Sequence, residues 1–526
     1  MKAQRLIKLA ALFVSVVVLG TGNAAQSSTA DHSTFQELQG PFGSGPEVTQ
    51  ACLKCHTEAA RQVMKTPHWT WEYKNPETGQ TLGKRHVLNN FCISVESNEP
   101  FCTTCHAGYG FKDNSFDFTR QENVDCLVCH DTTGKYRKQP GMAGLPPVQP
   151  LEWPPGSGKM ARPVNLAEVA QNVGKTSRDT CGACHFFGGG GDGVKHGDMD
   201  SSLAAPETDT DVHMDATGHD FTCATCHMTK GHAVPGSRYA PTARDDGGAM
   251  LRGKESDRNP GTCQACHDND PHKVARLNRH ADKLACQTCH IPKMARGGVA
   301  TKLSWDWSTA GKRGPDGKPL ITKDAKGHVI YDARKGDFVL GENVMPEYRW
   351  FNGTVNYTLL EDKIDNSKVV PINSFEGGPD DGKSLIWPVK VMRGKQPYDP
   401  VNKTLVKPHT AGSDDTSYWE NFGWEKAAAA GMASAGAEFS GKVEFVETEM
   451  SWPITHMVAP KGQAVGCAEC HSADSRLAAV PGIYMPGHSA RSWLDKAGWG
   501  LALLCLVGVI GHGGVRVATS RKGARK

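Results

Sequence analysis

The chain has 526 residues, including 18 cysteines and 22 histidines, and its formal net charge is +3. The N-terminal segment contributes three of the positive charges and the C-terminal tail five, with no acid in either, so residues 26–515 carry a net charge of −5. This balance excludes a large basic face of the kind that binds nucleic acid.

The first 25 residues have the pattern of a secretory signal peptide. Lys2, Arg5 and Lys8 precede an apolar run, and small residues stand at Ala24 and Ala25. Such a segment directs export and is removed from the mature protein. We therefore expect the protein to function in the periplasm.

The sequence C-x-x-C-H occurs eight times and uses 16 of the 18 cysteines. Two thiols at this spacing add to the two vinyl groups of one haem edge, and the histidine that follows ligates the iron. Zinc sites, iron–sulfur clusters or disulfides would not require a histidine directly after every second cysteine. We therefore predict eight covalently bound haem c groups, at Cys52/Cys55/His56, Cys102/Cys105/His106, Cys126/Cys129/His130, Cys181/Cys184/His185, Cys223/Cys226/His227, Cys263/Cys266/His267, Cys286/Cys289/His290 and Cys467/Cys470/His471.

Seven of these motifs crowd into residues 52–290, so each haem takes the place of apolar side chains as core. We expect a mainly α fold with long loops, organised around the haems, in which short helices carry the motifs. The predicted parts are the signal peptide at 1–25, a haem-binding core at 26–290, a haem-free insertion at 291–466, an eighth haem segment at 467–492, and a C-terminal anchor and basic tail at 493–526.

The insertion at residues 291–466 contains no haem motif. Its β-branched and aromatic runs beside glycine, asparagine and aspartate predict minor β hairpins. A helix is predicted to start near Asp415. We expect this part to cover one side of the haem array.

Residues 497–515 form an uncharged, largely apolar run that is followed by five basic residues. A run of this kind is close to the roughly 20 residues that cross a bilayer, and a basic tail favours the cytoplasmic side. The pattern predicts a C-terminal helix that anchors the protein to the cytoplasmic membrane, with a buried or interfacial helix as the alternative. A quinol-oxidising protein or another cytochrome is then the expected electron donor.

The second axial ligands decide where catalysis can occur, because a haem with imidazole on both faces carries electrons but offers no position for a substrate. Fourteen histidines lie outside the motifs, enough for seven such haems, so counting alone does not reveal an open site. From their places among the motifs, the predicted distal ligands are His68, His232, His272, His280, His456 and one of His213 and His219.

The eight motifs, the free Cys92 shortly before the second motif, and the stretch "CGACHFFGGGGDGVKHGDMD" at the fourth together resemble the octahaem tetrathionate reductase family, over roughly residues 45–490. The resemblance implies that the haem held by Cys102, Cys105 and His106 is catalytic. It also implies that a lysine is the distal ligand of that haem and that Cys92 lies beside its pocket. A buried, purely structural thiol is the alternative for Cys92.

The resemblance places the ligand lysine between the third and fourth motifs, where Lys175 is our choice and Lys159 the rival. An ammonium cannot ligate iron, so the amine must lie in a dry pocket that lowers its pKa. A thiol at Cys92 can exchange with a sulfur–sulfur bond. Lys84, Arg85 and His86 are expected to attract an oxyanion to the same haem.

Three functions follow from these patterns. The first is a multihaem reductase that delivers electrons to a small oxyanion substrate such as tetrathionate or nitrite, or to hydroxylamine. The second is a non-catalytic electron conduit between the quinone pool and a periplasmic partner. The third is an oxidase similar to hydroxylamine oxidoreductase, which would need a crosslinking tyrosine that the sequence does not identify. The sequence does not predict the oligomeric state.

Overall fold

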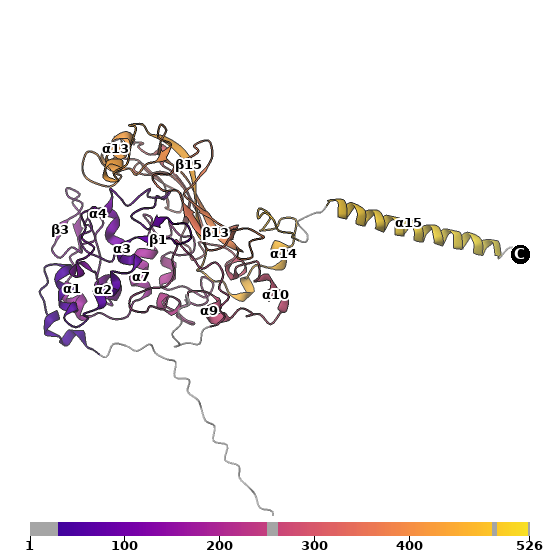
Figure 1. The fold of residues 1–526 in the computed structure, drawn as a ribbon, viewed down its shortest axis with the longest axis horizontal. Coiled ribbons are helices and arrows are strands. Elements are labelled where there is room, and N and C mark those ends of the chain that lie inside the picture. Colours follow the sequence, from indigo (N-terminus) through magenta and orange to yellow (C-terminus); the bar gives the residue numbers. More distant parts are fainter. Residues whose placement is uncertain (1–29, 250–260, 486–491, 524–526) are drawn as a thin grey trace, which may run out of the picture.

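The computed structural model describes residues 30–249, 261–485 and 492–523. The predicted signal peptide lies outside the described residues. Figure 1 shows a body with short helices below a sheet, and a long helix, α15 (Ser492–Gly523), that points away from the body.

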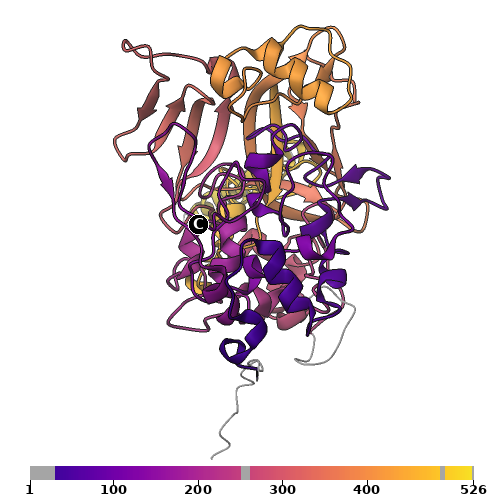
Figure 2. The ribbon, with the colours of Figure 1, turned by 90° about the vertical axis from the view of Figure 1, so that its left-hand side faces the viewer.

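Short helices joined by long loops carry the haem motifs, as the sequence predicts (Figure 2). Most motifs begin, fill or end a helical turn, because the backbone N–H of the motif histidine donates to the carbonyl of the first motif cysteine. At the second motif the His106 N–H donates instead to the Thr103 carbonyl, at 3.0 Å. The distance from the His56 N–H to the Cys52 carbonyl is 2.9 Å. The helices concerned are α1 (Gly45–Leu53), α4 (Glu99–Cys102), α5 (Leu127–His130), α7 (Arg178–His185), α8 (Cys223–Cys226), α9 (Gln264–His267), α11 (Cys286–His290) and α14 (Cys467–Cys470).

The haem-free part forms a nine-stranded sheet, so the prediction of minor hairpins is wrong in scale. The central strand β13 pairs antiparallel with β15 and parallel with β5, which are distant in sequence. The strands are β5 (Thr301–Asp306), β6 (Ile321–Lys323), β7 (Val329–Asp332), β8 (Gly336–Gly341), β9 (Glu347–Phe351), β11 (Val370–Pro371), β13 (Leu385–Asp399), β14 (Thr404–Leu405) and β15 (Glu444–Pro453).

The largest hydrophobic cluster of the molecule lies on this sheet. Trp305, Met392 and Trp452, from three neighbouring strands, are at most 1% exposed. Leu88 and Ile93, from the loop before the second haem motif, belong to the same cluster. The sheet therefore packs directly against the segment that contains Cys92.

The helix predicted to start near Asp415 is two helices. They are α12 (Tyr418–Asn421) and α13 (Trp424–Ser434), separated by a turn at Phe422. Phe422 has a left-handed backbone with φ 55°, which ends the first helix. Both helices lie above the sheet (Figure 2).

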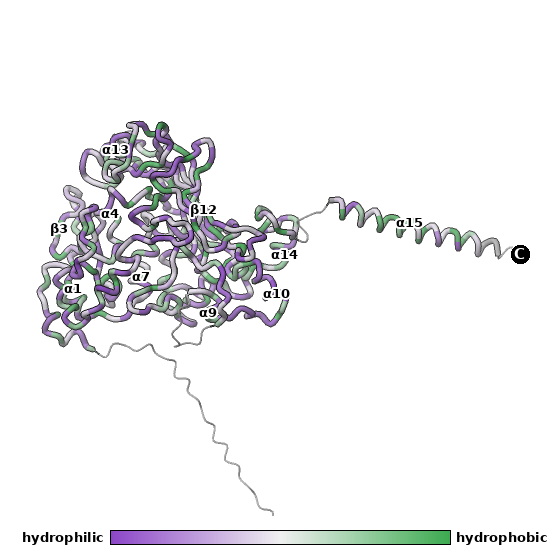
Figure 3. Tube along the Cα trace, viewed as in Figure 1, coloured by the Kyte–Doolittle hydropathy of each residue, from purple (hydrophilic) through white to green (hydrophobic). Residues whose placement is uncertain are grey.

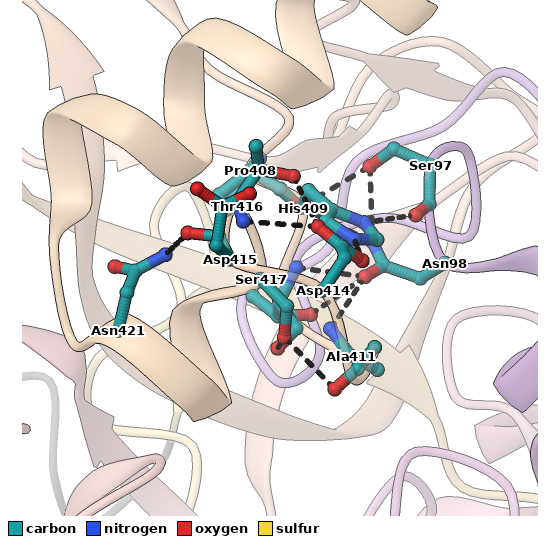
Figure 4. Close-up of polar contacts among 12 residues, drawn as sticks. Ser97, Asn98, Pro408, His409, Ala411, Asp414, Asp415, Thr416, Ser417 and Asn421 are labelled. Atoms are coloured by element: carbon teal, nitrogen blue, oxygen red, sulfur yellow. Dashed lines mark hydrogen bonds and ion pairs between the residues drawn. The ribbon is translucent and has the colours of Figure 1, made fainter.

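A polar junction joins the sheet part to the second motif (Figure 4). Asn98, directly before α4, accepts hydrogen bonds at Oδ1 from the backbone N–H groups of Thr410 and Ala411, at 2.8 and 2.9 Å. Its Nδ2 donates to the Pro408 carbonyl at 3.1 Å. The helix that leads into Cys102 is thus fixed to a loop about 310 residues later.

The C-terminal helix is long and apolar enough to cross a membrane. The segment from Trp493 to Ser520 has a mean hydropathy of 1.8 over its most apolar window, and no part of that window is buried in the protein. Figure 3 shows the hydrophobic colouring along it. This helix contains the predicted run at 497–515 and is compatible with a membrane anchor.

Candidate functional site

Seven of the eight motif histidines face a second histidine from another part of the chain. In every pair, the ring centroids lie between 5.8 and 6.4 Å apart. The pairs are His56 with His32, His130 with His232, His185 with His68, His227 with His456, His267 with His213, His290 with His272 and His471 with His280.

These distances provide a test of whether haem fits the site. Two imidazoles that bind one metal ion from opposite sides, each at roughly 2 Å, have ring centroids roughly 6 Å apart. The facing rings therefore match two axial ligands of one iron, and the cysteine pair of each motif is available to hold the vinyl edge. The residues present fit a covalently attached haem at these seven motifs.

The motif cysteines differ in burial. Cys55 and Cys266, both predicted as haem-attachment residues, are exposed rather than buried. The exposed motif cysteines are Cys55, Cys129, Cys226, Cys266 and Cys467.

Exposure of these thiols does not conflict with haem attachment. A vinyl group must reach each sulfur from a side that the polypeptide leaves open, and the macrocycle joined there is itself a large apolar group. The attachment of haem at Cys55 and Cys266 stays a prediction from the C-x-x-C-H pattern.

The predicted distal histidines can be compared with the facing pairs. The structure brings five of them opposite motif histidines: His68, His232, His272, His280 and His456. Of the remaining two, it places His213 against His267, whereas the His219 ring lies against Phe221 at 5.5 Å. The sequence analysis missed His32, which stands close to the predicted signal peptide and outside the run of motifs.

The second motif differs from the other seven. His106 is fully buried, and its Nε2 lies 2.6 Å from the Trp69 carbonyl oxygen. The neighbouring rings are aromatic and include Trp71 and Phe111, each at 5.1 Å. Burial lowers the pKa of His106 to about 3, so its imidazole is neutral. Among the described residues, no histidine ring faces it.

A glycine-rich loop after α7 brings Lys195 and Cys92 to the second motif. A Cβ at Gly190 would lie 3.3 Å from the Cys92 sulfur, and a Cβ at Gly189 would lie 3.2 Å from the Lys195 Cβ. Both glycines have φ near +90°, a conformation that glycine adopts readily. Glycine is therefore needed here for both backbone shape and close approach.

Lys195 has the electrostatic environment of an amine that can ligate a metal. Burial holds its pKa well below the usual value, and the charges of Arg238 and Lys84 lower it further. Cys105 of the second motif is close enough to act in the opposite direction. A neutral amine beside the second motif is what the family resemblance requires.

The two lysines chosen from sequence do not have this environment. Lys175 and Lys159 are both exposed, and Lys159 lines a surface hollow with Trp153 and Met160. The structure therefore gives no support to Lys175 as the ligand. The signal that could have identified Lys195 is its position in the glycine-rich stretch that carries the resemblance, after the fourth motif rather than before it.

Cys92 lies in a turn that Asn89 organises. The Asn89 Oδ1 accepts hydrogen bonds from the backbone N–H groups of Phe91, Cys92 and Ile93, at 3.1, 2.6 and 3.0 Å. Burial raises the pKa of the Cys92 thiol, although nearby lysines oppose this shift. Cys92 is thus a thiol at neutral pH and needs a base before it can act as a nucleophile.

Several basic side chains lie around Cys92 and Lys195. Lys302 is 6% exposed, lies over the Trp305 ring at 3.9 Å, and has its pKa lowered to about 7 by burial. Arg238 lies over the Trp452 ring at 4.7 Å. Lys84 lies over the Trp71 ring at 4.7 Å. Such a concentration of positive charge attracts an anion.

Of the basic residues expected from sequence around residue 85, only Lys84 takes part in this cluster. Arg85 Nη1 lies 3.7 Å from a Glu72 carboxylate oxygen, and His86 Nε2 lies 2.9 Å from the same oxygen. Their side chains are therefore directed to Glu72.

The motifs themselves touch one another through their thiols. Four hydrogen bonds between thiols join motifs in pairs. They run from Cys126 to Cys52 (third and first motifs), from Cys184 to Cys105 (fourth and second), from Cys181 to Cys223 (fourth and fifth) and from Cys263 to Cys286 (sixth and seventh). Three further pairs lie near enough for one thiol to raise the pKa of the other: Cys129 with Cys181, Cys226 with Cys263, and Cys470 with Cys289. The second motif is thus a branch that joins the path of these pairs at the fourth motif.

Comparisons with known proteins agree with this geometry. A crystal structure of octaheme cytochrome c from Shewanella oneidensis is 42% identical, with a TM-score of 0.74, and the match covers 86% of this chain and 95% of that chain. A family model described as bacterial cytochrome c matches residues 302–474. An uncharacterized protein of Archaeoglobus fulgidus is 25% identical over 287 residues, which cover 46% of this chain and 94% of that protein.

Proposed function

Because the chain belongs to the octahaem c-type cytochromes, we propose that it is a reductase that acts at the haem of the second motif, with Lys195 as its displaceable axial ligand. One observation carries the proposal: seven motif histidines face a second histidine, whereas His106 does not. When bound, the haems supply one-electron redox chemistry and an iron that accepts two axial ligands.

The residues around Cys92 favour a small oxyanion as substrate. Lys84, Lys302 and Arg238 provide positive charge on several sides of the pocket. The dianion tetrathionate, which has a sulfur–sulfur bond, also suits a nearby thiol. Nitrite and hydroxylamine are the other acceptors that we propose.

With tetrathionate, the Cys92 thiolate attacks a central sulfur, forms a mixed disulfide with one thiosulfate unit and releases the other thiosulfate. The proton leaves Cys92 to a base, and the free amine of Lys195, held on the adjoining loop, is suited to accept it. Two electrons and one proton then cleave the mixed disulfide, which restores the thiol and releases the second thiosulfate.

We further propose that α15 anchors the protein to the cytoplasmic membrane, with the body in the periplasm. The length and hydropathy of the helix support this placement. A quinol-oxidising protein or another cytochrome at the membrane would then supply electrons to the motif path.

The decisive experiment compares Lys195→Ala with the exposed control Lys175→Ala. We expect Lys195→Ala to increase carbon monoxide binding to the reduced protein and to change turnover with tetrathionate, nitrite and hydroxylamine, while Lys175→Ala changes neither. Unaltered spectra and turnover in Lys195→Ala would exclude this lysine as the ligand.

A non-catalytic conduit is the second candidate function, and the continuous path of motif contacts favours it. In that case, neither the native protein nor Lys195→Ala would bind carbon monoxide, and no acceptor would be turned over.

A further inference from the structure

Lys390, in the middle of β13, has a buried amine that the proposed reaction does not use. It is fully buried, and its Nζ donates to the Val194 carbonyl at 2.7 Å and, at a longer 3.3 Å, to the Lys195 carbonyl. A third bond, of 2.6 Å, goes to the Thr301 hydroxyl. All three acceptors are neutral.

A buried charge without a counter-ion is costly unless hydrogen bonds compensate for lost hydration. Burial lowers the pKa of Lys390 to about 7, and the Asp198 carboxylate opposes this shift, but in the part of the chain that the structure describes no carboxylate forms an ion pair with the Lys390 Nζ. A shorter apolar side chain would fill this position of the sheet at lower cost. The reason for a lysine at this position therefore lies in its three hydrogen bonds, two to loop carbonyls and one to Thr301.

Thr301, on the neighbouring strand β5, binds the same loop. Its hydroxyl lies 2.7 Å from the Gly193 carbonyl and 3.3 Å from the His196 carbonyl. The single proton of the hydroxyl is best placed for the Gly193 carbonyl, so Thr301 and Lys390 together donate to the three consecutive carbonyls of residues 193–195. A Cβ at Gly197 would come within 3.3 Å of the Lys390 Cδ, so glycine also permits the close contact at the end of this loop.

We propose that Lys390 and Thr301 form a clamp that fixes the backbone of the loop carrying Lys195, so that only the Lys195 side chain moves when the ligand is displaced. The inference rests on the proposed function of Lys195 and makes Lys390 a positioning residue. It explains how a loop rich in flexible glycines can present one amine in one place. It also gives the haem-free sheet a part in the chemistry of the second motif.

The first test is Lys390→Met in the full-length, haem-loaded protein. The loss of charge-assisted bonds frees the loop, so Lys195 competes less well for its position and carbon monoxide affinity rises about tenfold. Lys407→Met is the matched control: Lys407 is 4% exposed, but it pairs with Glu96 and not with the loop. We expect that control to leave the affinity unchanged.

Hydrogen exchange of the amides in residues 190–197 provides a readout that does not depend on ligand binding. We expect faster exchange in Lys390→Met and, to a smaller extent, in Thr301→Val, a nearly isosteric change that tests the clamp if the first variant does not fold. Lys390→Arg, which retains donors, should restore part of the native protection.

Two results would overturn the clamp. One is that the amides of residues 190–197 exchange at the native rate in folded Lys390→Met; the other is that carbon monoxide affinity rises as much in Lys407→Met as in Lys390→Met. Failure of the proposed function has a different signature: Lys195→Ala would leave carbon monoxide binding unchanged, while the loop would still exchange faster in Lys390→Met.

Discussion

The two main parts of the body are stabilised in different ways. The buried clusters that residues 30–290 form by themselves are small, such as the one of Ala60, Trp69 and Val124, and nine further residues of this part join the cluster on the sheet. Residues 291–466 form a nine-stranded sheet whose buried cluster is the largest described. The first part depends on haems as core, and the second depends on side chains.

The two parts nevertheless depend on each other, because each contributes residues to the other's surroundings. The sheet provides Trp452, Lys302 and Lys390 to the surroundings of the second motif, and it receives Leu88 and Ile93 into its core. A side-chain core can hold a loop in one conformation because it is close-packed. The haem-bearing part thus gains a rigid wall at the second motif, whose histidine faces no other histidine ring among the described residues.

The largest expected effect comes from removing the fourth haem with Cys181→Ser/Cys184→Ser. Because the fourth motif joins the second to the path, we expect tetrathionate turnover to fall by at least about 100-fold, which corresponds to about 2.7 kcal/mol in the barrier. Mass spectrometry would show one haem fewer. The control Cys52→Ser/Cys55→Ser also removes one haem, at the end of the path, and equal losses of turnover in the two variants would contradict the branched arrangement.

A cavity in the sheet should destabilise residues 291–466 without affecting haem attachment in residues 30–290. Met392 is fully buried in the main cluster, so Met392→Ala should reduce the free energy of unfolding by about 3 kcal/mol. Denaturant unfolding would measure this loss, and mass spectrometry should still find all eight haems. A drop in haem number would show that the haem-bearing part needs the sheet core in order to mature.

Asn98→Ala should separate the two parts at their junction. The backbone N–H groups of Thr410 and Ala411 would lose their buried acceptor, which costs about 2 kcal/mol of unfolding free energy. Asn98→Asp keeps an acceptor oxygen and should lose less stability in the same denaturant titration. Equal stability of both variants with the native protein would show that the junction contributes nothing.

The smallest effect concerns pH. Burial raises the pKa of Glu99 above its ordinary 4.5, and the charges of Glu96 and Asp113 add to this. The folded state therefore holds the proton more tightly, so stability is highest below pH 4.5 and falls as pH rises through the folded-state pKa. Glu99→Gln should raise the denaturant midpoint at pH 7 and leave it nearly unchanged at pH 4. A lower midpoint at pH 7 would contradict this sign.

Local patterns in the sequence predicted the features that depend on neighbouring residues. The eight motifs, the apolar C-terminal helix and the short helices at the motifs are of this kind, because a few adjacent residues determine each one. The distal histidines were chosen by proximity to motifs, which succeeded where the partner stands inside the motif run. It failed for His32, which lies before the first motif.

Features that depend on distant contacts could not be predicted. β13 is buried on nearly every position, yet it contains Lys390 and two prolines, and its partners β5 and β15 are dozens of residues away. Lys195 was missed for a related reason: its low pKa comes from burial by loops that are remote in sequence. The exposure of Cys55 and Cys266 likewise depends on which distant segments pass near their turns. Composition and periodicity carry no information about such pairings.

The facing histidine rings also differ in orientation. Three pairs are close to parallel, with interplanar angles of 12°, 18° and 32°. Four are crossed, at 61° to 82°. Because the plane of an axial imidazole selects the iron orbital with which it interacts, ferric centres of the two kinds differ in magnetic anisotropy. One electron paramagnetic resonance spectrum of the oxidised protein should therefore contain two families of low-spin signals, with the centre at the second motif belonging to neither.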